Sequence, residues 1–190
     1  MQQEQLKYSK RELELMFSKS KRSADQAFGV IYKHYKRQIF AYCITILKDK
    51  EMAEDAFQET FSKFYKACVK GATLDNIKGF LIKIARNLCL NKNNFEKRYV
   101  EFDPVTANKQ VTTQNFENEQ ILSIVMEGID TLPEKYREPL ILKKVEGLTY
   151  KEIADLLDIT VEGAKTRVTR ARTKLFDIMQ PYLEELKDYS

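Results

Sequence analysis

The chain has 190 residues, of which 43% are hydrophobic and 32% are charged, and its net charge is +4. This length allows one large domain or two small ones, and the hydrophobic content excludes a chain that is disordered throughout. No stretch approaches the ~20 consecutive apolar residues that cross a bilayer, and the first residues lack the apolar core of a signal peptide. We therefore expect a cytoplasmic protein without direct membrane insertion.

The N-terminal part of the chain predicts three helices. Apolar residues recur at every third or fourth position over 24–47, 53–65 and 77–92, which is the spacing of a buried helical stripe. Asp49 is a plausible N-cap for the second of these helices. Residues 1–92 are basic, with 18 Lys and Arg against 10 Asp and Glu, and we expect them to form one helical domain.

The character of the sequence changes after this domain. Residues 93–120 contain Pro104, many Asn, Gln and Thr, and no sustained period, which predicts a linker. Periodicity resumes near Ile121 and predicts a second helical domain over residues 121–190. The expected fold class is therefore all-α, with two small helical domains joined by a flexible linker.

Two short helices in the second domain predict a helix-turn-helix. Thr149 with Glu152 three residues later forms the pattern of a capping box, and Thr160 is placed to cap the next helix. The two helices are separated by a tight turn at 158–160. In a helix-turn-helix the second helix enters the major groove of DNA and reads bases with its N-terminal residues.

The second helix of this motif concentrates positive charge. Residues 161–175 hold five Lys and Arg and one acid, although residues 121–190 as a whole carry 11 basic residues against 13 acidic ones. An apolar stripe fixes the buried face and leaves these residues outward: Glu162, Lys165, Thr166, Thr169, Arg170 and Thr173. An ordinary solvated helix would also be rich in Lys and Arg. Turn, caps and charge together favour DNA binding.

The C-terminal stretch LPEKYREPLILKKVEGLTYKEIADLLDITVEGAKTRVTRARTKL resembles region 4 of bacterial sigma factors of the extracytoplasmic-function (ECF) type. The resemblance implies that this domain reads the −35 promoter element and binds the β flap of core RNA polymerase. It implies DNA contacts at Glu162, Lys165, Thr166, Arg167, Thr169, Arg170 and Thr173. Three departures stand out: Asp158 where many relatives have Gly, Gly163-Ala164 for the commoner Thr-Val, and Pro139 inside a helix expected over 133–146, which should be kinked or divided.

The N-terminal half resembles region 2 of the same family. AEDAFQETFSKFY, residues 53–65, is similar to the helix that binds the β′ clamp, which implies contacts by Glu54, Asp55, Gln58 and Glu59. A solvated acidic face would look the same. GFLIKIARNLCLNK, residues 79–92, is similar to the helix that engages the −10 element. With the loop 70–76 it implies DNA contacts by Lys70, Asn76, Lys83, Arg86, Asn87 and Asn91.

The resemblance implies a sigma factor that directs promoter-specific transcription initiation, with core RNA polymerase, promoter DNA and an anti-sigma factor as partners. The main alternative is a conventional helix-turn-helix transcriptional regulator, which would leave the N-terminal matches unexplained. An enzyme is disfavoured. The sequence shows no phosphate-binding Gly loop, no Cys and His set with metal spacing and no nucleophile with a base, so no metal, cofactor or catalytic residue is expected.

Overall fold

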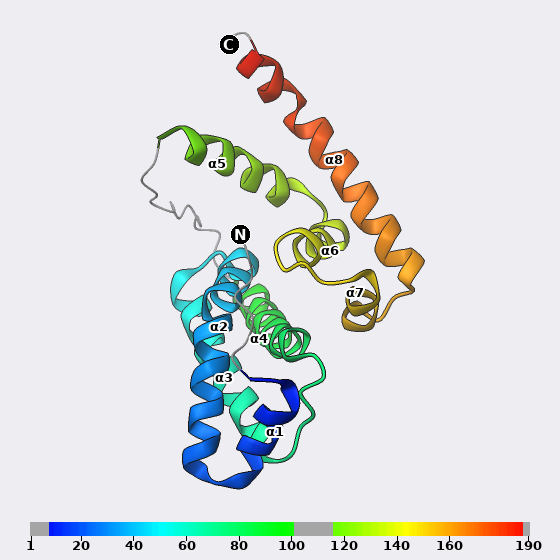
Figure 1. The fold of residues 1–190 in the computed structure, drawn as a ribbon. Helices are drawn as coiled ribbons and strands as arrows, with labels where there is room; N and C mark the ends of the chain where they lie inside the picture. Colours follow the sequence, from blue (N-terminus) through cyan, green and yellow to red (C-terminus); the bar gives the residue numbers. More distant parts are fainter. Residues whose placement is uncertain (1–7, 101–115, 188–190) are drawn as a thin grey trace. The chain divides into compact units, whose positions relative to one another are not determined.

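The computed structural model describes residues 8–100 and 116–187, and every regular element within these ranges is an α-helix (Figure 1). This confirms the expected all-α fold class. The helices are α1 (Lys10–Lys19), α2 (Lys21–Leu47), α3 (Lys50–Val69), α4 (Ile77–Val100), α5 (Phe116–Thr131), α6 (Glu134–Lys144), α7 (Tyr150–Leu157) and α8 (Val161–Lys187).

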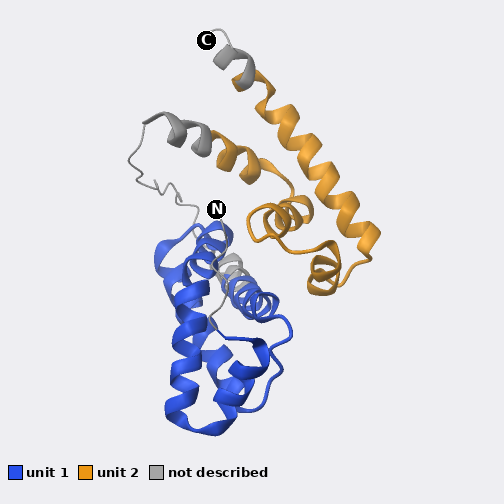
Figure 2. Cartoon of the chain, in the orientation of Figure 1, with its two compact units in different colours: residues 1–109 blue, residues 110–190 orange. Residues whose placement is uncertain are grey.

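The chain divides into two compact units, residues 1–109 (unit 1) and residues 110–190 (unit 2) (Figure 2). Helix occupies both ends of the segment 93–120 that the sequence predicts as a linker, because α4 continues to Val100 and α5 begins at Phe116. Residues 101–115 of that segment lie outside the described residues. The domain limits 1–92 and 121–190 remain predictions.

Unit 1 is built from α1 to α4 around a core of aromatic side chains. Phe64 on α3 is fully buried and contacts Phe17 on α1 and Phe80 on α4, with ring centroids 6.5 and 5.6 Å apart. The N-cap of α3 is Asp49, whose Oδ1 accepts from the Met52 amide at 2.9 Å, as the sequence predicts. Helices α2 and α3 each pack on the other three helices, so together they form the centre of this unit.

Helix α1 was not expected from the sequence. It begins with a capping box between Ser9 and Glu12, and it buries Leu13 and Phe17 against the rest of unit 1. The Ser-x-x-Glu pattern is a local signal from which the start of this helix could have been predicted.

The three cysteines, Cys43, Cys68 and Cys89, are buried and free of disulfides. Burial, and secondly the negative charge of Glu14, raise the pKa of the Cys68 thiol to about 12. In the unfolded chain a cysteine has a pKa of about 8.5. The contribution of this thiol to stability is therefore complete below about pH 8.5 and is lost as pH rises towards 12.

We expect Cys68 in the folded chain to resist iodoacetamide at pH 8, because the thiolate is the reactive form and the side chain is only 4% exposed. Alkylation of the folded chain, mapped by mass spectrometry, should be at least ~10-fold slower than that of the urea-unfolded chain. Equal rates would show that the C-terminal end of α3 opens readily.

Unit 2 is built from α5 to α8. Arg137 on α6 holds the C-terminal end of α5: its Nη2 donates to the Leu132 carbonyl at 2.8 Å and to the Asp130 carbonyl, and its Nε donates to the Ile129 carbonyl at 3.2 Å. Of the two expected effects of Pro139, division of the helix is wrong, since α6 continues from Glu134 to Lys144, and a kink stays a prediction. Pro139 and the three residues that follow it, Leu140, Ile141 and Leu142, are all buried in unit 2.

Candidate nucleic-acid interface

The local geometry of α7 and α8 is that of a helix-turn-helix. The Thr149 amide donates to Glu152 Oε2 at 2.6 Å, and the Glu152 amide donates to Thr149 Oγ1 at 3.2 Å, which completes the predicted capping box. Asp158 ends α7 in the left-handed region with φ 54° and ψ 54°. Thr160 Oγ1 then accepts from the Gly163 amide at 3.0 Å and caps α8, as predicted. At the C-terminal end of α7, Asp158 thus adopts the left-handed conformation in which glycine is more usual.

Small residues set how closely α7 and α8 approach. Ala154 on α7 is 3% exposed, and Ala164 and Ala171 on α8 are fully buried together with Val168. Larger side chains here would separate the two helices. This apolar stripe therefore fixes which face of α8 points to solvent.

The solvent-facing side of α8 carries the predicted DNA-binding residues. Six of the seven are exposed: Glu162, Lys165, Thr166, Thr169, Arg170 and Thr173, whereas Arg167 is half-buried. The Arg170 guanidinium also lies near the phenol oxygen of Tyr136 on α6 and lowers the pKa of Tyr136, chiefly through hydrogen bonding. This contact restrains Arg170 from a neighbouring helix and could not be predicted from the sequence.

A second polar face lies on α4. Lys83, Asn87 and Asn91 are exposed and follow each other at intervals of four, so they share one side of the helix. Arg86 is half-buried beside them, and Lys70 is exposed at the end of α3. Lys83, Asn87 and Asn91 thus give this side of α4 hydrogen-bond donors and acceptors of the kinds that contact phosphates and bases.

Asn76 has a structural role that the sequence reasoning missed. Its Oδ1 accepts from the Gly79 amide at 2.8 Å and so caps the start of α4. A Cβ atom at Gly79 would stand 2.3 Å from Asn76 Nδ2, so glycine leaves room for this cap. The Asn-x-x-Gly spacing before an apolar helical stripe was the available signal.

The third predicted surface is the acidic face of α3, formed by Glu54, Asp55, Gln58 and Glu59, all exposed. Three of these residues form ion pairs: Glu54 with Lys50 at 3.9 Å, Glu59 with Lys63 at 3.0 Å, and Asp55 with Lys92 of α4 at 3.5 Å. Exposed pairs of this kind contribute only ~0–1 kcal/mol each. They leave the carboxylates able to exchange partners.

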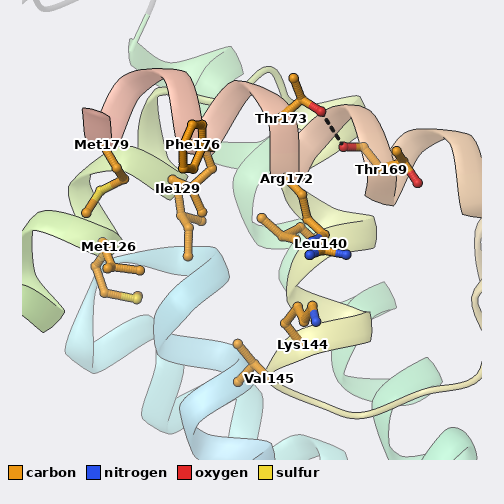
Figure 3. A pocket seen from close by; sticks show the side chains of 12 residues that line it. Met126, Ile129, Leu140, Lys144, Val145, Thr169, Arg172, Thr173, Phe176 and Met179 are labelled. Atoms are coloured by element: carbon orange, nitrogen blue, oxygen red, sulfur yellow. Dashed lines mark hydrogen bonds between the residues drawn. The ribbon is translucent and has the colours of Figure 1, made fainter. Parts of the chain in front are cut away.

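Unit 2 also has an apolar groove between α5, α6 and α8 that the sequence reasoning did not predict (Figure 3). The groove has a volume of about 760 Å³. Two large apolar side chains at its edge stay exposed, Phe176 (60%) and Val145 (50%). The cations Lys144 and Arg172 also line it. The remaining lining residues are Val125, Met126, Ile129, Leu140, Thr169, Thr173, Leu175 and Met179.

Two other kinds of site were sought in the part of the chain that the structure describes. Among residues 8–100 and 116–187 no three His, Cys, Asp or Glu side chains are grouped so as to hold a metal ion. Within the same ranges, no helix has the length and apolar character needed to span a membrane.

Comparison with known families matches both units. Residues 31–98 match the model of Sigma-70 region 2, and residues 122–175 match the model of Sigma-70, region 4. Region 2 followed by region 4 on an all-α chain is the architecture of the sigma-70 class of transcription initiation factors. Together the two matched segments account for more than half of the chain.

Comparison with individual proteins shows which type of sigma factor this chain is most like among those described next. The chain is 29% identical over 148 residues to the ECF RNA polymerase sigma factor SigM of Bacillus subtilis, with 76% of this chain and 90% of SigM covered. It is 27% identical over 180 residues to SigW of the same organism, with 86% and 96% covered. The chain belongs to the ECF-type sigma factors.

Solved structures share this fold. The sigma factor RpoE from Bartonella quintana, in complex with the anti-sigma factor NepR, superimposes with a TM-score of 0.70 at 22% identity over 82% of this chain and 96% of RpoE. CnrH, in complex with the cytosolic domain of CnrY, gives a TM-score of 0.67 at 18% identity over 90% of this chain and 97% of CnrH.

Proposed function

We propose that this chain binds core RNA polymerase and directs it to specific promoters, reading the −35 element with α8 and opening the −10 element with the loop 70–76 and α4. The observation that carries this proposal is the presence of both sigma regions on one chain, each with its polar face exposed. A conventional helix-turn-helix regulator would use α7 and α8 in the same way. It would leave the match of residues 31–98 to Sigma-70 region 2 unexplained.

Residues on α8 and α4 have different tasks in this proposal. The exposed Lys, Arg and Thr side chains of α8 suit the edges of bases and the phosphates of a duplex. Opening the −10 element instead requires an unstacked base to be held outside the helix, which polar and aromatic contacts favour. Lys83, Asn87 and Asn91 would hold the separated strand. The protein supplies binding energy only, and catalysis belongs to the polymerase.

We expect Asp55→Ala combined with Glu59→Ala to weaken binding to core polymerase by about tenfold. This corresponds to ~1.4 kcal/mol for two charge contacts, each of the size measured for exposed pairs. The measurement is a titration of labelled full-length chain with purified core polymerase. The same loss should not occur for Asp155→Ala combined with Asp177→Ala, which removes equal charge from exposed positions of unit 2.

Two results would contradict the proposal. Unchanged affinity of the α3 double variant would exclude this face as the binding surface. Absence of any binding to core polymerase by the unmodified chain, together with sequence-specific binding of the chain alone to duplex DNA, would establish the regulator instead.

A regulatory protein is a further proposed partner. RpoE and CnrH were both solved with a protein bound to them, an anti-sigma factor and the cytosolic domain of CnrY. By analogy we include an anti-sigma factor among the partners of this chain. The place of action is the cytoplasm, where a promoter-specificity factor finds its polymerase.

A further inference from the structure

The loop 70–76 between α3 and α4 is fixed at both ends by backbone and capping contacts. At its start Gly71 has φ +92°, and the amides of Gly71 and Ala72 donate to the carbonyls of Cys68 and Ala67, both at 3.0 Å. At its end Asn76 caps α4. A left-handed glycine and an N-cap define where the loop begins and ends. The residues between them need another support.

Helix α1 supplies that support. Glu14 Oε1 accepts from the Leu74 amide at 2.6 Å, and Lys10 Nζ donates to the carbonyl of Asp75. Glu14 and Lys10 stand four residues apart on α1 and so lie on the same side of it. The Leu74 side chain is itself 1% exposed. Two peptide units of the loop, Thr73–Leu74 and Asp75–Asn76, are thereby tied to one face of α1.

The support is itself rigid. Leu13 and Phe17 on the neighbouring face of α1 are 0% and 5% exposed, which anchors α1 in the core of unit 1. After burial, the charge of Glu14 is the second cause of the raised pKa of the Cys68 thiol at the end of α3. The carboxylate therefore lies where α1, α3 and the loop meet.

We propose that Glu14, assisted by Lys10, is a positioning residue that fixes the conformation of the loop 70–76 and thereby sets base discrimination at the −10 element. This inference rests on the proposed function of the loop. A site that selects one unstacked base must hold its shape before the base arrives. Thr73 and Asp75, two exposed residues of the loop, flank Leu74, whose amide Glu14 holds. Glu14 and Lys10 precede the segment that matches sigma-70 region 2.

The test uses the full chain with core polymerase and a library of duplex promoters randomised across the −35 and −10 elements. Sequencing of the transcripts gives the preference for each base at each position. We expect Glu14→Ala to lower the preference at one or more −10 positions by roughly tenfold, the effect of losing one hydrogen bond to a charged group. Preferences at the −35 element and affinity for core polymerase should stay unchanged.

Two further variants separate positioning from simple destabilisation. Glu14→Gln keeps a side-chain carbonyl that can accept from the Leu74 amide, so it should restore most of the −10 preference. Glu12→Ala removes the same charge from the same helix and disrupts its capping box, but it leaves the Leu74 contact in place. Hydrogen exchange of the Leu74 amide, followed by NMR, should become faster in Glu14→Ala and remain slow in Glu12→Ala.

Lys10→Met serves if Glu14→Ala does not fold, because Lys10 is exposed and its loss removes only the Asp75 contact. It should reduce the preference at the same −10 positions by a smaller factor. Wild-type preferences at every −10 position in folded Glu14→Ala, or in Lys10→Met when that variant replaces it, would overturn the inference and leave the proposed function intact. Failure of the unmodified chain to bind core polymerase or initiate on any library member would overturn both.

Discussion

Replacing Lys165 and Arg170 together with alanine is expected to lower transcription from a promoter that depends on its −35 element by on the order of a hundredfold. A good side-chain contact to a base contributes ~1–3 kcal/mol of discrimination, and ~1.4 kcal/mol corresponds to tenfold. Both side chains project from the exposed face of α8. Buried Ala164 and Val168 fix the opposite face, so neither substitution disturbs the packing of α7 on α8.

The measurement is in vitro transcription on a pair of templates that differ only in whether the −35 element is intact or scrambled. The unmodified chain should prefer the intact template, and the double variant should transcribe both at the same low level. Tyr136→Phe is the matched control, since it removes the hydroxyl that interacts with Arg170 and keeps the positive charge of Arg170 itself. A double variant that still prefers the intact template would exclude α8 as the reading element.

Substitution of Phe64 by alanine should destabilise unit 1 by ~3–5 kcal/mol, the range for removing a large aromatic side chain from a core. Phe64 is fully buried and contacts aromatic side chains from both α1 and α4, so the cavity would open where three helices meet. Urea unfolding of the full chain, followed by circular dichroism, measures the loss.

Leu15→Ala provides the control for this substitution. Leu15 lies on α1 but is 60% exposed, so its loss should change stability by less than ~0.5 kcal/mol. A loss below ~1 kcal/mol for Phe64→Ala would contradict the prediction, because it would mean that the neighbouring side chains collapse into the space.

Local features of the fold could be predicted from the sequence. The N-caps at Asp49, Thr149 and Thr160 were all expected and are present in the structure. Such caps depend on residues two or three positions apart, so the sequence displays both partners together. The buried stripes of α2, α3 and α8 follow from the same short-range periodicity.

Contacts between distant segments could not be predicted in this way. Helix α1 has only two buried residues, Leu13 and Phe17, and its other leucine, Leu15, points to solvent, so its stripe is weak. The partner of Glu14 stands sixty residues away in the loop. The groove in unit 2 likewise needs three helices to assemble before it exists.

In the candidate site too, features set by a local pattern could be predicted and contacts between distant residues could not. Periodicity identified the exposed faces of α3, α4 and α8, because burial of one face determines the other. It did not show that Asn76 caps α4 or that Arg170 contacts Tyr136. Both side chains have a partner within the chain, and the choice between that partner and DNA depends on geometry that a one-dimensional pattern lacks.

The ion pairs on α3 mean that any partner of its acidic face must compete with lysines of the same chain. Three carboxylates of its acidic face are already neutralised by Lys50, Lys63 and Lys92. A basic protein that meets this face at random must displace these lysines and gains little, since one cation merely replaces another. Only a surface whose cations match the spacing of the carboxylates can compete at several positions simultaneously. In the proposed binding to core polymerase, this competition would favour a partner whose cations match the positions of the carboxylates.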